Sequence, residues 1–187
     1  VEAGGFWSSL AVVDENGKCT LYSRMGKEFT TLDKVKEAIE ATNIINTVFD
    51  GEICIMDDNG DEDFQSVMKQ LRRKDHQIEN PVFMMFDMLH KSEFEQTECQ
   101  QTVLSERLHK LRSWCPGREG HLPGFFDGIL TYTNQSIITS DSHLDTWNTL
   151  ASDNNWEGFM LRKDVPYEGK RTKNLLKVKK FHDAEYQ

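Results

Sequence analysis

The sequence predicts an α+β fold built on antiparallel sheets, with helices inserted between groups of strands. Segments typical of strands outnumber helical ones and do not alternate regularly with them, which argues against repeated βαβ units. Asn16-Gly17 stands between the first two apolar stretches and is a strong hairpin signal. A chain of 187 residues can form one large domain or two small ones. Because no clear boundary is visible, we expect a single domain over residues 1–187.

Strands are predicted where apolar residues alternate with polar ones or run continuously. They lie near residues 8–13, 18–23, 47–56, 82–89, 126–132, 158–163 and 174–181. Helices are predicted where apolar residues recur at helical spacing between capping and breaking residues. They lie near residues 30–42, which follow a threonine cap, and near 63–74, 101–114 and 140–154.

The net charge of −9 argues against a simple non-specific nucleic-acid binder, but it does not exclude a local basic groove. No apolar run approaches the roughly 18 residues of a membrane span, and we see no signal-peptide pattern. The four cysteines form no metal-binding or disulfide pattern, which favours free thiols in an intracellular compartment. Since the first residues already resemble a strand, we expect the chain to begin inside a longer polypeptide.

Two lysines on one face of the last strand need an explanation in an acidic chain. Side chains alternate between the faces of a strand, so Lys177 and Lys179 share a face with Phe181. An isolated ammonium is costly to bury, and two adjacent ones repel each other. A polyphosphate against this face would explain the arrangement. The alternative is an edge strand whose lysines face water and discourage edge pairing.

Carboxylates accompany other apolar strands. Glu52 follows Asp50-Gly51 at the start of one such strand, and Glu157 precedes another. Asp87 is embedded in an almost wholly apolar segment, where a carboxylate requires a hydrogen-bond partner. Carboxylates, paired lysines and nearby aromatic rings are together what a nucleotide with a divalent metal ion needs.

Five short segments occur in the order of the motifs of a known family. They read LYSRMGKEF, FDGEI, FMMFDMLH, EGFMLRK and LLKVKKFHDAE. With them the chain resembles the nucleotidyltransferase (adenylation) domain of ATP-dependent DNA ligases, which are relatives of RNA ligases and mRNA capping enzymes. The motifs cover nearly the whole chain. The resemblance implies an ATP-grasp-like domain whose sheets and helices form a nucleotide cleft.

The resemblance also implies roles for individual residues. Glu52 would bind the ribose or assist metal binding, Phe86 would stack on adenine, and Glu157 would contact magnesium or its water shell. Lys177 and Lys179 would hold the α-phosphate and neutralise charge during its transfer.

The other residues implied by the resemblance are contacts to the nucleotide or to DNA. Arg24 would contact the nucleotide or the phosphate of the DNA end. Arg162 and Arg171 are weaker candidates for phosphate or DNA contacts. Glu2 and Ala3 would belong to the nucleotide site as the lead-in to the first motif, in which a glutamate reads adenine.

The family's reaction has three steps, with ATP and Mg²⁺ as cofactors and nicked double-stranded DNA as partner. A lysine attacks the α-phosphate of ATP to give lysyl-AMP, AMP moves to the 5′-phosphate at a nick, and the 3′-hydroxyl displaces AMP. Each transfer builds negative charge around phosphorus, so paired lysines and magnesium suit the chemistry. The implied processes are DNA repair and replication.

The family's first motif, Lys-x-Asp-Gly, is missing from its expected place. There the sequence reads Glu2-Ala3-Gly4-Gly5, and the first lysine, Lys18, lies in the predicted hairpin turn. Either these residues replace the motif, and the chain cannot form lysyl-AMP, or the motif lysine and its neighbours are missing from the sequence beside Ala3. We favour the second explanation because the other motifs are intact.

Three functions are therefore open. They are an ATP-dependent DNA ligase, an RNA ligase or capping-type nucleotidyltransferase, and a catalytically dead module that binds nucleotide or DNA ends. The Asp-Ala-Glu that follows the two-lysine motif favours the DNA ligase. We also expect the family's C-terminal OB-fold domain to follow this chain in the parent protein, because the family uses that domain to clamp DNA.

Overall fold

The structure is a computed structural model that describes residues 8–55, 63–95, 102–115, 128–133, 135–153 and 158–179. Contacts within the chain divide it into two compact units. The larger unit spans Gly5–Thr133 and also takes in the short segment Asp164–Gly169. The smaller unit includes Asn134–Lys163 and Lys170–Gln187. The chain therefore leaves the smaller unit for six residues that belong to the larger one, and then returns.

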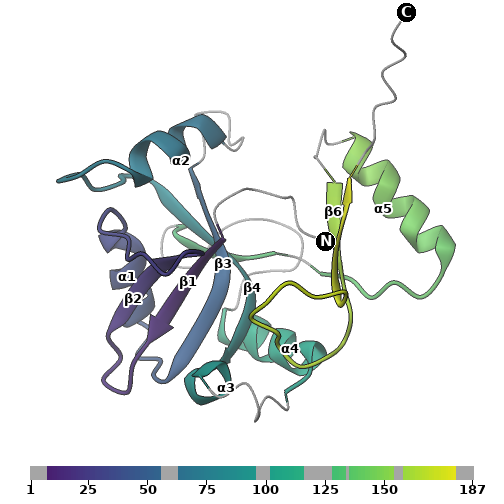
Figure 1. The fold of residues 1–187 in the computed structure, drawn as a ribbon, viewed down its shortest axis with the longest axis horizontal. Coiled ribbons are helices and arrows are strands. Elements are labelled where there is room, and N and C mark those ends of the chain that lie inside the picture. Colours follow the sequence, from purple (N-terminus) through teal and green to yellow (C-terminus); the bar gives the residue numbers. More distant parts are fainter. Residues whose placement is uncertain are drawn as a thin grey trace, which may run out of the picture. The chain divides into compact units, whose positions relative to one another are not determined.

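The larger unit is built on a five-stranded sheet with the order β2-β1-β3-β4-β5 (Figure 1). Its strands are β1 (Ser8–Val13), β2 (Cys19–Ser23), β3 (Thr47–Ile55), β4 (Pro81–His90) and β5 (Leu130–Tyr132). The pairings β1–β2, β1–β3 and β3–β4 are antiparallel, whereas β4–β5 is parallel. The predicted α+β class is confirmed, and the parallel pairing of β5 is the departure from a purely antiparallel sheet.

The helices of the larger unit fall between its strands. They are α1 (Asp33–Glu40), α2 (Phe64–Leu71), α3 (Lys91–Glu95) and α4 (Leu104–Trp114). The backbone N–H of Ser66 donates to the side chain of Asp63, which caps α2. The predicted threonine cap of α1 is wrong, because the apolar residue Leu32 occupies the cap position and its own side chain makes no capping hydrogen bond. The five-residue helix α3 was not predicted.

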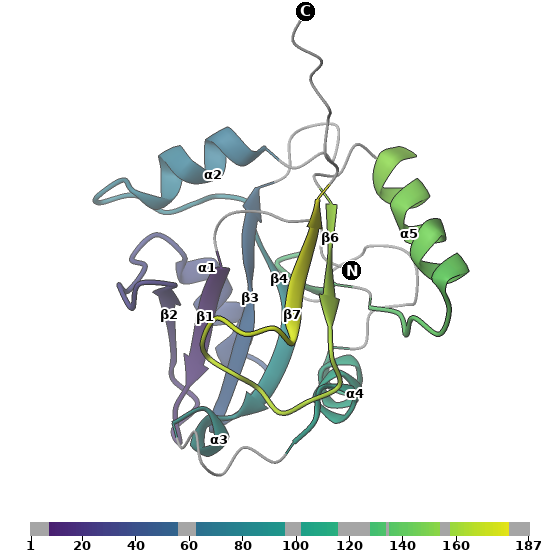
Figure 2. The ribbon, with the colours of Figure 1, turned by 45° about the vertical axis from the view of Figure 1, so that its right-hand side comes forward.

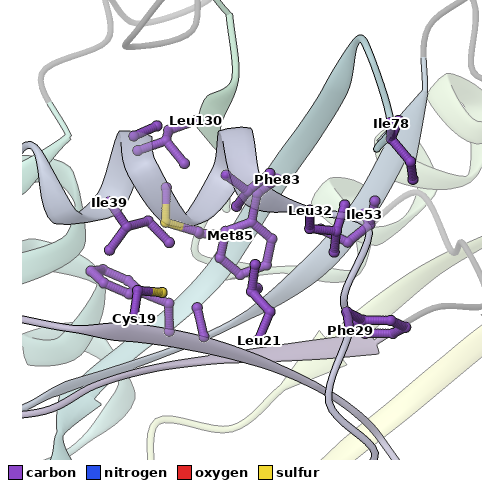
Figure 3. Packing of buried hydrophobic residues seen from close by; sticks show 14 of the residues in the cluster. Cys19, Leu21, Phe29, Leu32, Ile39, Ile53, Ile78, Phe83, Met85 and Leu130 are labelled. Carbon is purple, nitrogen blue, oxygen red and sulfur yellow. The ribbon is translucent and has the colours of Figure 1, made fainter. Parts of the chain in front are cut away.

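One face of the sheet carries the hydrophobic core. Ile39 of α1 packs there with Phe83 and Met85 of β4 and with Leu21 of β2 (Figure 3). Helix α4 contributes Leu111 to the same cluster. Successive side chains of a strand point to opposite faces of the sheet. The apolar residues of β1, β3 and β4 that face the core therefore alternate with residues that point to the opposite face.

Among its described residues, the smaller unit contains an antiparallel strand pair and one helix (Figure 2). The strands are β6 (Gly158–Arg162) and β7 (Leu175–Lys179), and the helix is α5 (Asp141–Asp153). Phe159 of β6 and Ala151 of α5 are buried, and α5 lies beside β6.

No helix within the described ranges is both long and apolar enough to cross a membrane. Three cysteines in these ranges, Cys19, Cys54 and Cys115, are buried thiols. Burial raises the pKa of the Cys115 thiol to about 11 and that of Cys19 to about 12.

Gly51 in the middle of β3 has no room for a side chain. A Cβ atom at this position would lie 2.6 Å from the carbonyl oxygen of Met84 and 2.6 Å from the ring of Phe83. We expect Gly51→Ala to destabilise the fold by about 1–3 kcal/mol through overpacking, measured by urea unfolding. Gly169→Ala is the control, since its Cβ would make only an ordinary contact of 3.7 Å with Tyr167. An unchanged unfolding midpoint for Gly51→Ala would contradict the packing described.

Candidate functional site

The candidate site begins on the sheet face opposite the core, around Glu52 in the middle of β3. In the register, Glu52 lies between Ser8 of β1 and Met84 of β4. Asp50 shares its face, two residues earlier on the same strand. The Glu52 side chain is almost fully buried, which is unusual for a carboxylate. We call the sheet surface around Ser8, Asp50, Glu52, Met84 and Asp87 the Glu52 face.

A β-bulge in the pairing of β3 with β4 lies beside Glu52 and includes Phe86. Asp50 pairs with Asp87 and Gly51 pairs with Met85, so Phe86 is the extra residue of β4 at this point. Its side chain is half-buried. Bulges bend a strand locally and redirect side chains, and they are frequent beside functional sites. The structure thus brings Glu52 and Phe86, which were both predicted for the nucleotide site, to adjacent strands at one irregularity.

Arg24 lies at the same end of the sheet as Glu52. It follows Ser23, which pairs with Ser9 of β1, and the preceding residue of β1, Ser8, pairs with Glu52. Arg24 is exposed in a tight turn that is closed by a hydrogen bond from Gly26 N–H to the Ser23 carbonyl, 2.8 Å long. Its guanidinium is therefore accessible to a ligand.

Asp87 has the buried partner that its apolar surroundings require. Arg107 of α4 donates from Nε to Oδ1 at 2.7 Å and from Nη2 to Oδ2 at 3.0 Å. Both side chains are almost completely buried. The backbone N–H of Met88 donates to the same carboxylate at 2.9 Å. The prediction that Asp87 needs a partner is confirmed, although the sequence had not named Arg107.

Arg107 also holds the segment Asp164–Gly169, which we call the tether. Its Nη1 atom donates to the carbonyl oxygens of Thr102, at 2.6 Å, and of Val165, at 3.2 Å. Its guanidinium carbon lies 5.7 Å from the centre of the Tyr167 ring, within the range of a cation–π contact.

Tyr167 and Asp164 give the tether further polar contacts with the rest of the larger unit. The Tyr167 hydroxyl donates to Oδ2 of Asp50 at 2.8 Å, and the Ser8 hydroxyl lies 3.5 Å from Oδ1. The backbone N–H and the hydroxyl of Ser105 donate to Asp164 at 2.7 and 2.8 Å. These two hydrogen bonds lower the pKa of the Asp164 carboxyl below its usual value.

The smaller unit gathers three cations on one face of its strand pair. Lys177 lies opposite Met160, Lys179 opposite Gly158, and Leu175 opposite Arg162. Opposed residues of an antiparallel pair share a face, so Arg162 joins Lys177 and Lys179 there. We call this the basic face. Both lysines are exposed and accessible to an anion, and Arg162 is half-buried.

The basic face depends on close backbone contact at Gly158. A Cβ atom on Gly158 would lie only 1.9 Å from the carbonyl oxygen of Val178, so glycine is required opposite Lys179. Arg171 lies in the connection between β6 and β7 and is exposed. Within the residues that the structure describes, β7 has one strand neighbour, so an edge strand with lysines facing water remains compatible with it.

Glu157, Glu2, Ala3 and the segment of the missing first motif lie outside the described residues. The two residues that sequence reasoning missed are Arg107 and Tyr167. Arg107 had a signal, because it stands in the buried stripe of α4 between Leu104 and Leu111, where a cation needs a buried anion. Tyr167 had none, since its partner Asp50 is 117 residues away.

Solved structures of other proteins share this fold. "Pmar-Lig_PreS3" matches with a TM-score of 0.71 at 22% identity, over 94% of this chain and 43% of that one. The ATP-dependent DNA ligase from bacteriophage T7, in complex with ATP, matches with a TM-score of 0.66 at 13% identity, over 94% of this chain and 59% of that one. The fold is therefore the one found in ATP-dependent DNA ligases.

Comparison of the sequence with family models identifies the family of this chain. The model of the family described as "ATP dependent DNA ligase domain" matches residues 10–179, and the chain belongs to this family. The SPbeta prophage-derived DNA ligase-like protein LigB of Bacillus subtilis is 28% identical over 88% of this chain and 55% of its own length. The multifunctional non-homologous end joining protein LigD of Pseudomonas aeruginosa is 23% identical over 88% of this chain and 18% of its own. The chain thus spans about half the length of the first relative and less than a fifth of the second.

Proposed function

We propose that this chain is the nucleotidyltransferase part of an ATP-dependent DNA ligase, which binds ATP with Mg²⁺ and passes AMP to the 5′-phosphate of nicked double-stranded DNA. The observation that carries the proposal is the basic face. Three cations share one side of a two-stranded sheet in a family member whose net charge is −9. A polyanion is the ligand that such a face fits.

The nucleoside end of ATP is assigned to the Glu52 face. Phe86 is a half-buried ring at the bulge, and an aromatic ring in such a position can stack on adenine. Glu52 supplies carboxylate oxygens that can accept hydrogen bonds from the ribose hydroxyls. Glu2 and Ala3 are assigned to the adenine-binding part of the site only because they precede the position of the family's first motif.

The phosphates are assigned to Lys177 and Lys179. Negative charge develops on the oxygens around phosphorus during each transfer, and fixed cations stabilise it most where water is excluded. Arg24 is assigned to the nucleotide or to the phosphate of the DNA end, and Arg162 and Arg171 to phosphate or DNA contacts. Their guanidinium groups suit phosphate because they can donate two parallel hydrogen bonds.

Mg²⁺ would be held by Glu52 and Glu157 together with the phosphates of ATP. The described ranges contain no group of three or more His, Cys, Asp and Glu side chains that could hold a metal ion. This donor set fits magnesium, which is commonly bound by one or two carboxylates plus substrate phosphates. When bound, the ion would polarise the phosphoryl oxygens and offset their charge.

The missing motif lysine supports a second candidate, a module that binds nucleotide or DNA ends without forming lysyl-AMP. The sequence Glu2-Ala3-Gly4-Gly5 offers no amine nucleophile, and Lys18 follows Gly17 in the turn before β2. Reading the parent gene across residues 1–6 separates the candidates. A gene that encodes a lysine there supports the ligase, and an uninterrupted Glu-Ala-Gly-Gly supports the binding module.

ATP binding tests what both candidates share. We expect Phe86→Leu to weaken ATP binding about 5- to 150-fold, because stacking of a base on an aromatic ring contributes roughly 1–3 kcal/mol. Binding of inorganic tripolyphosphate should be unchanged, since it has no base. Isothermal titration of both ligands is the measurement.

Tyr132→Leu, another half-buried ring of the same sheet, is the control for lost aromatic packing. Equal weakening of ATP and tripolyphosphate by Phe86→Leu would contradict the assignment of adenine to Phe86. Wild-type protein that binds neither ligand would contradict the proposed function as a whole.

A further inference from the structure

Two carboxylates face each other across the strands at the bulge. Asp50 of β3 and Asp87 of β4 are paired in the register, immediately beside Gly51 and Phe86. Like charges directly opposite each other on one sheet face are destabilising unless other groups compensate them. Both carboxylates are compensated here, and by different means.

The two compensating groups contact each other. Arg107 neutralises Asp87 with two hydrogen bonds, and Tyr167 donates its hydroxyl to Asp50. The Arg107 guanidinium lies 5.7 Å from the Tyr167 ring centre. A continuous chain of contacts thus runs from Asp50 through Tyr167 and Arg107 to Asp87. We call these four residues the clamp.

The clamp joins the two strands at the place where their register shifts. A strand that slips by one residue moves every side chain to the other face, so a bulge needs local contacts that fix its position. Within the clamp, Asp50 lies two residues from Glu52 on β3, and Asp87 is adjacent to Phe86 on β4. Contacts to both aspartates therefore fix the backbone of both strands immediately beside the two proposed nucleoside contacts.

We propose that Arg107 and Tyr167 are positioning residues for the nucleoside of ATP, which hold the bulge so that Glu52 and Phe86 are presented together. This inference rests on the proposed function, since it takes Glu52 and Phe86 as the nucleoside contacts. Neither Arg107 nor Tyr167 is proposed to contact the nucleotide directly. Their effect passes through Asp87 and Asp50.

Removing one hydroxyl gives the mildest test. We expect Tyr167→Phe to weaken ATP binding about 5- to 10-fold in isothermal titration and to leave tripolyphosphate binding unchanged, because only the nucleoside contacts depend on the clamp. Tyr132→Phe is the matched control, since it removes a hydroxyl from another half-buried tyrosine of the same unit and is expected to bind ATP as the wild type does.

A double variant separates positioning from stability. Asp87→Leu with Arg107→Met replaces the buried ion pair by apolar side chains, a change that often preserves or improves stability. We expect the double variant to unfold near the wild-type midpoint and still to bind ATP at least about 5-fold more weakly, with unchanged tripolyphosphate binding. A merely structural role would restore the affinity together with the midpoint.

Two results would overturn the inference. One is wild-type ATP affinity in either Tyr167→Phe or the double variant, and the other is equal weakening of ATP and tripolyphosphate in either of them. In both cases the proposed function stands if the wild type binds ATP and Phe86→Leu weakens that binding selectively. If the wild type binds no ATP, the proposed function fails, and the inference fails with it.

Discussion

Replacing Arg107 alone with methionine is expected to destabilise the protein by about 3–5 kcal/mol, because the substitution leaves the buried carboxylate of Asp87 without its cation. Asp87 and Arg107 are both almost completely buried, and two hydrogen bonds join them. The carbonyl oxygens of Thr102 and Val165 would lose the guanidinium as well. Urea unfolding monitored by circular dichroism measures the change.

The matched control for this prediction is Lys91→Met. It removes the cation of a partly exposed pair with Glu95, 3.2 Å long and one helical turn apart, which contributes only about 0.5 kcal/mol. A loss of the same small size for Arg107→Met would show that the buried pair does not hold α4 and the tether against β4. Failure of Asp87→Leu to recover stability in the Arg107→Met background would contradict the electrostatic explanation.

Replacing both Lys177 and Lys179 with methionine is expected to weaken the binding of ATP and of tripolyphosphate by about 100-fold or more. Each hydrogen bond to a charged group contributes roughly 1.5–3 kcal/mol, and tenfold in affinity corresponds to about 1.4 kcal/mol. Methionine keeps a similar length and lacks the charge. Titration at several salt concentrations should show a shallower salt dependence in the variant, since two cations no longer meet the phosphates.

The control for the lysine variant is Lys170→Met with Lys173→Met. Both lysines are exposed in the connection between β6 and β7, and the change in net charge is the same. We expect this control to bind ATP within about twofold of the wild type, because long-range screening leaves little effect at physiological salt. Equal losses in the two double variants would show that total charge, and not the basic face, governs binding.

Much of the fold could be predicted because apolar periodicity is a local signal. The expected strands near residues 8–13, 47–56 and 82–89 correspond to β1, β3 and β4. The parallel pairing of β5 could not be predicted, because a short apolar run does not specify its neighbour in a sheet. The five residues of α3 are too few to establish a helical period.

Features of the candidate site could be predicted only where they depend on residue type and on position within one strand. Alternation on β7 correctly put Lys177 and Lys179 on one face, and the structure adds Arg162 opposite Leu175. The expected partner of Asp87 required the fold, because Arg107 lies 20 residues away on α4. The bulge that makes Phe86 an extra residue depends on cross-strand register, which a single strand's sequence does not encode.

The most direct test of the proposal is a crystal structure of the protein grown with ATP and Mg²⁺. We expect the adenine ring against Phe86, a ribose hydroxyl within hydrogen-bond distance of Glu52, and the α-phosphate within hydrogen-bond distance of Lys177 or Lys179. A nucleotide bound elsewhere, with Phe86 and both lysines free of contact to it, would contradict the proposed nucleotide site.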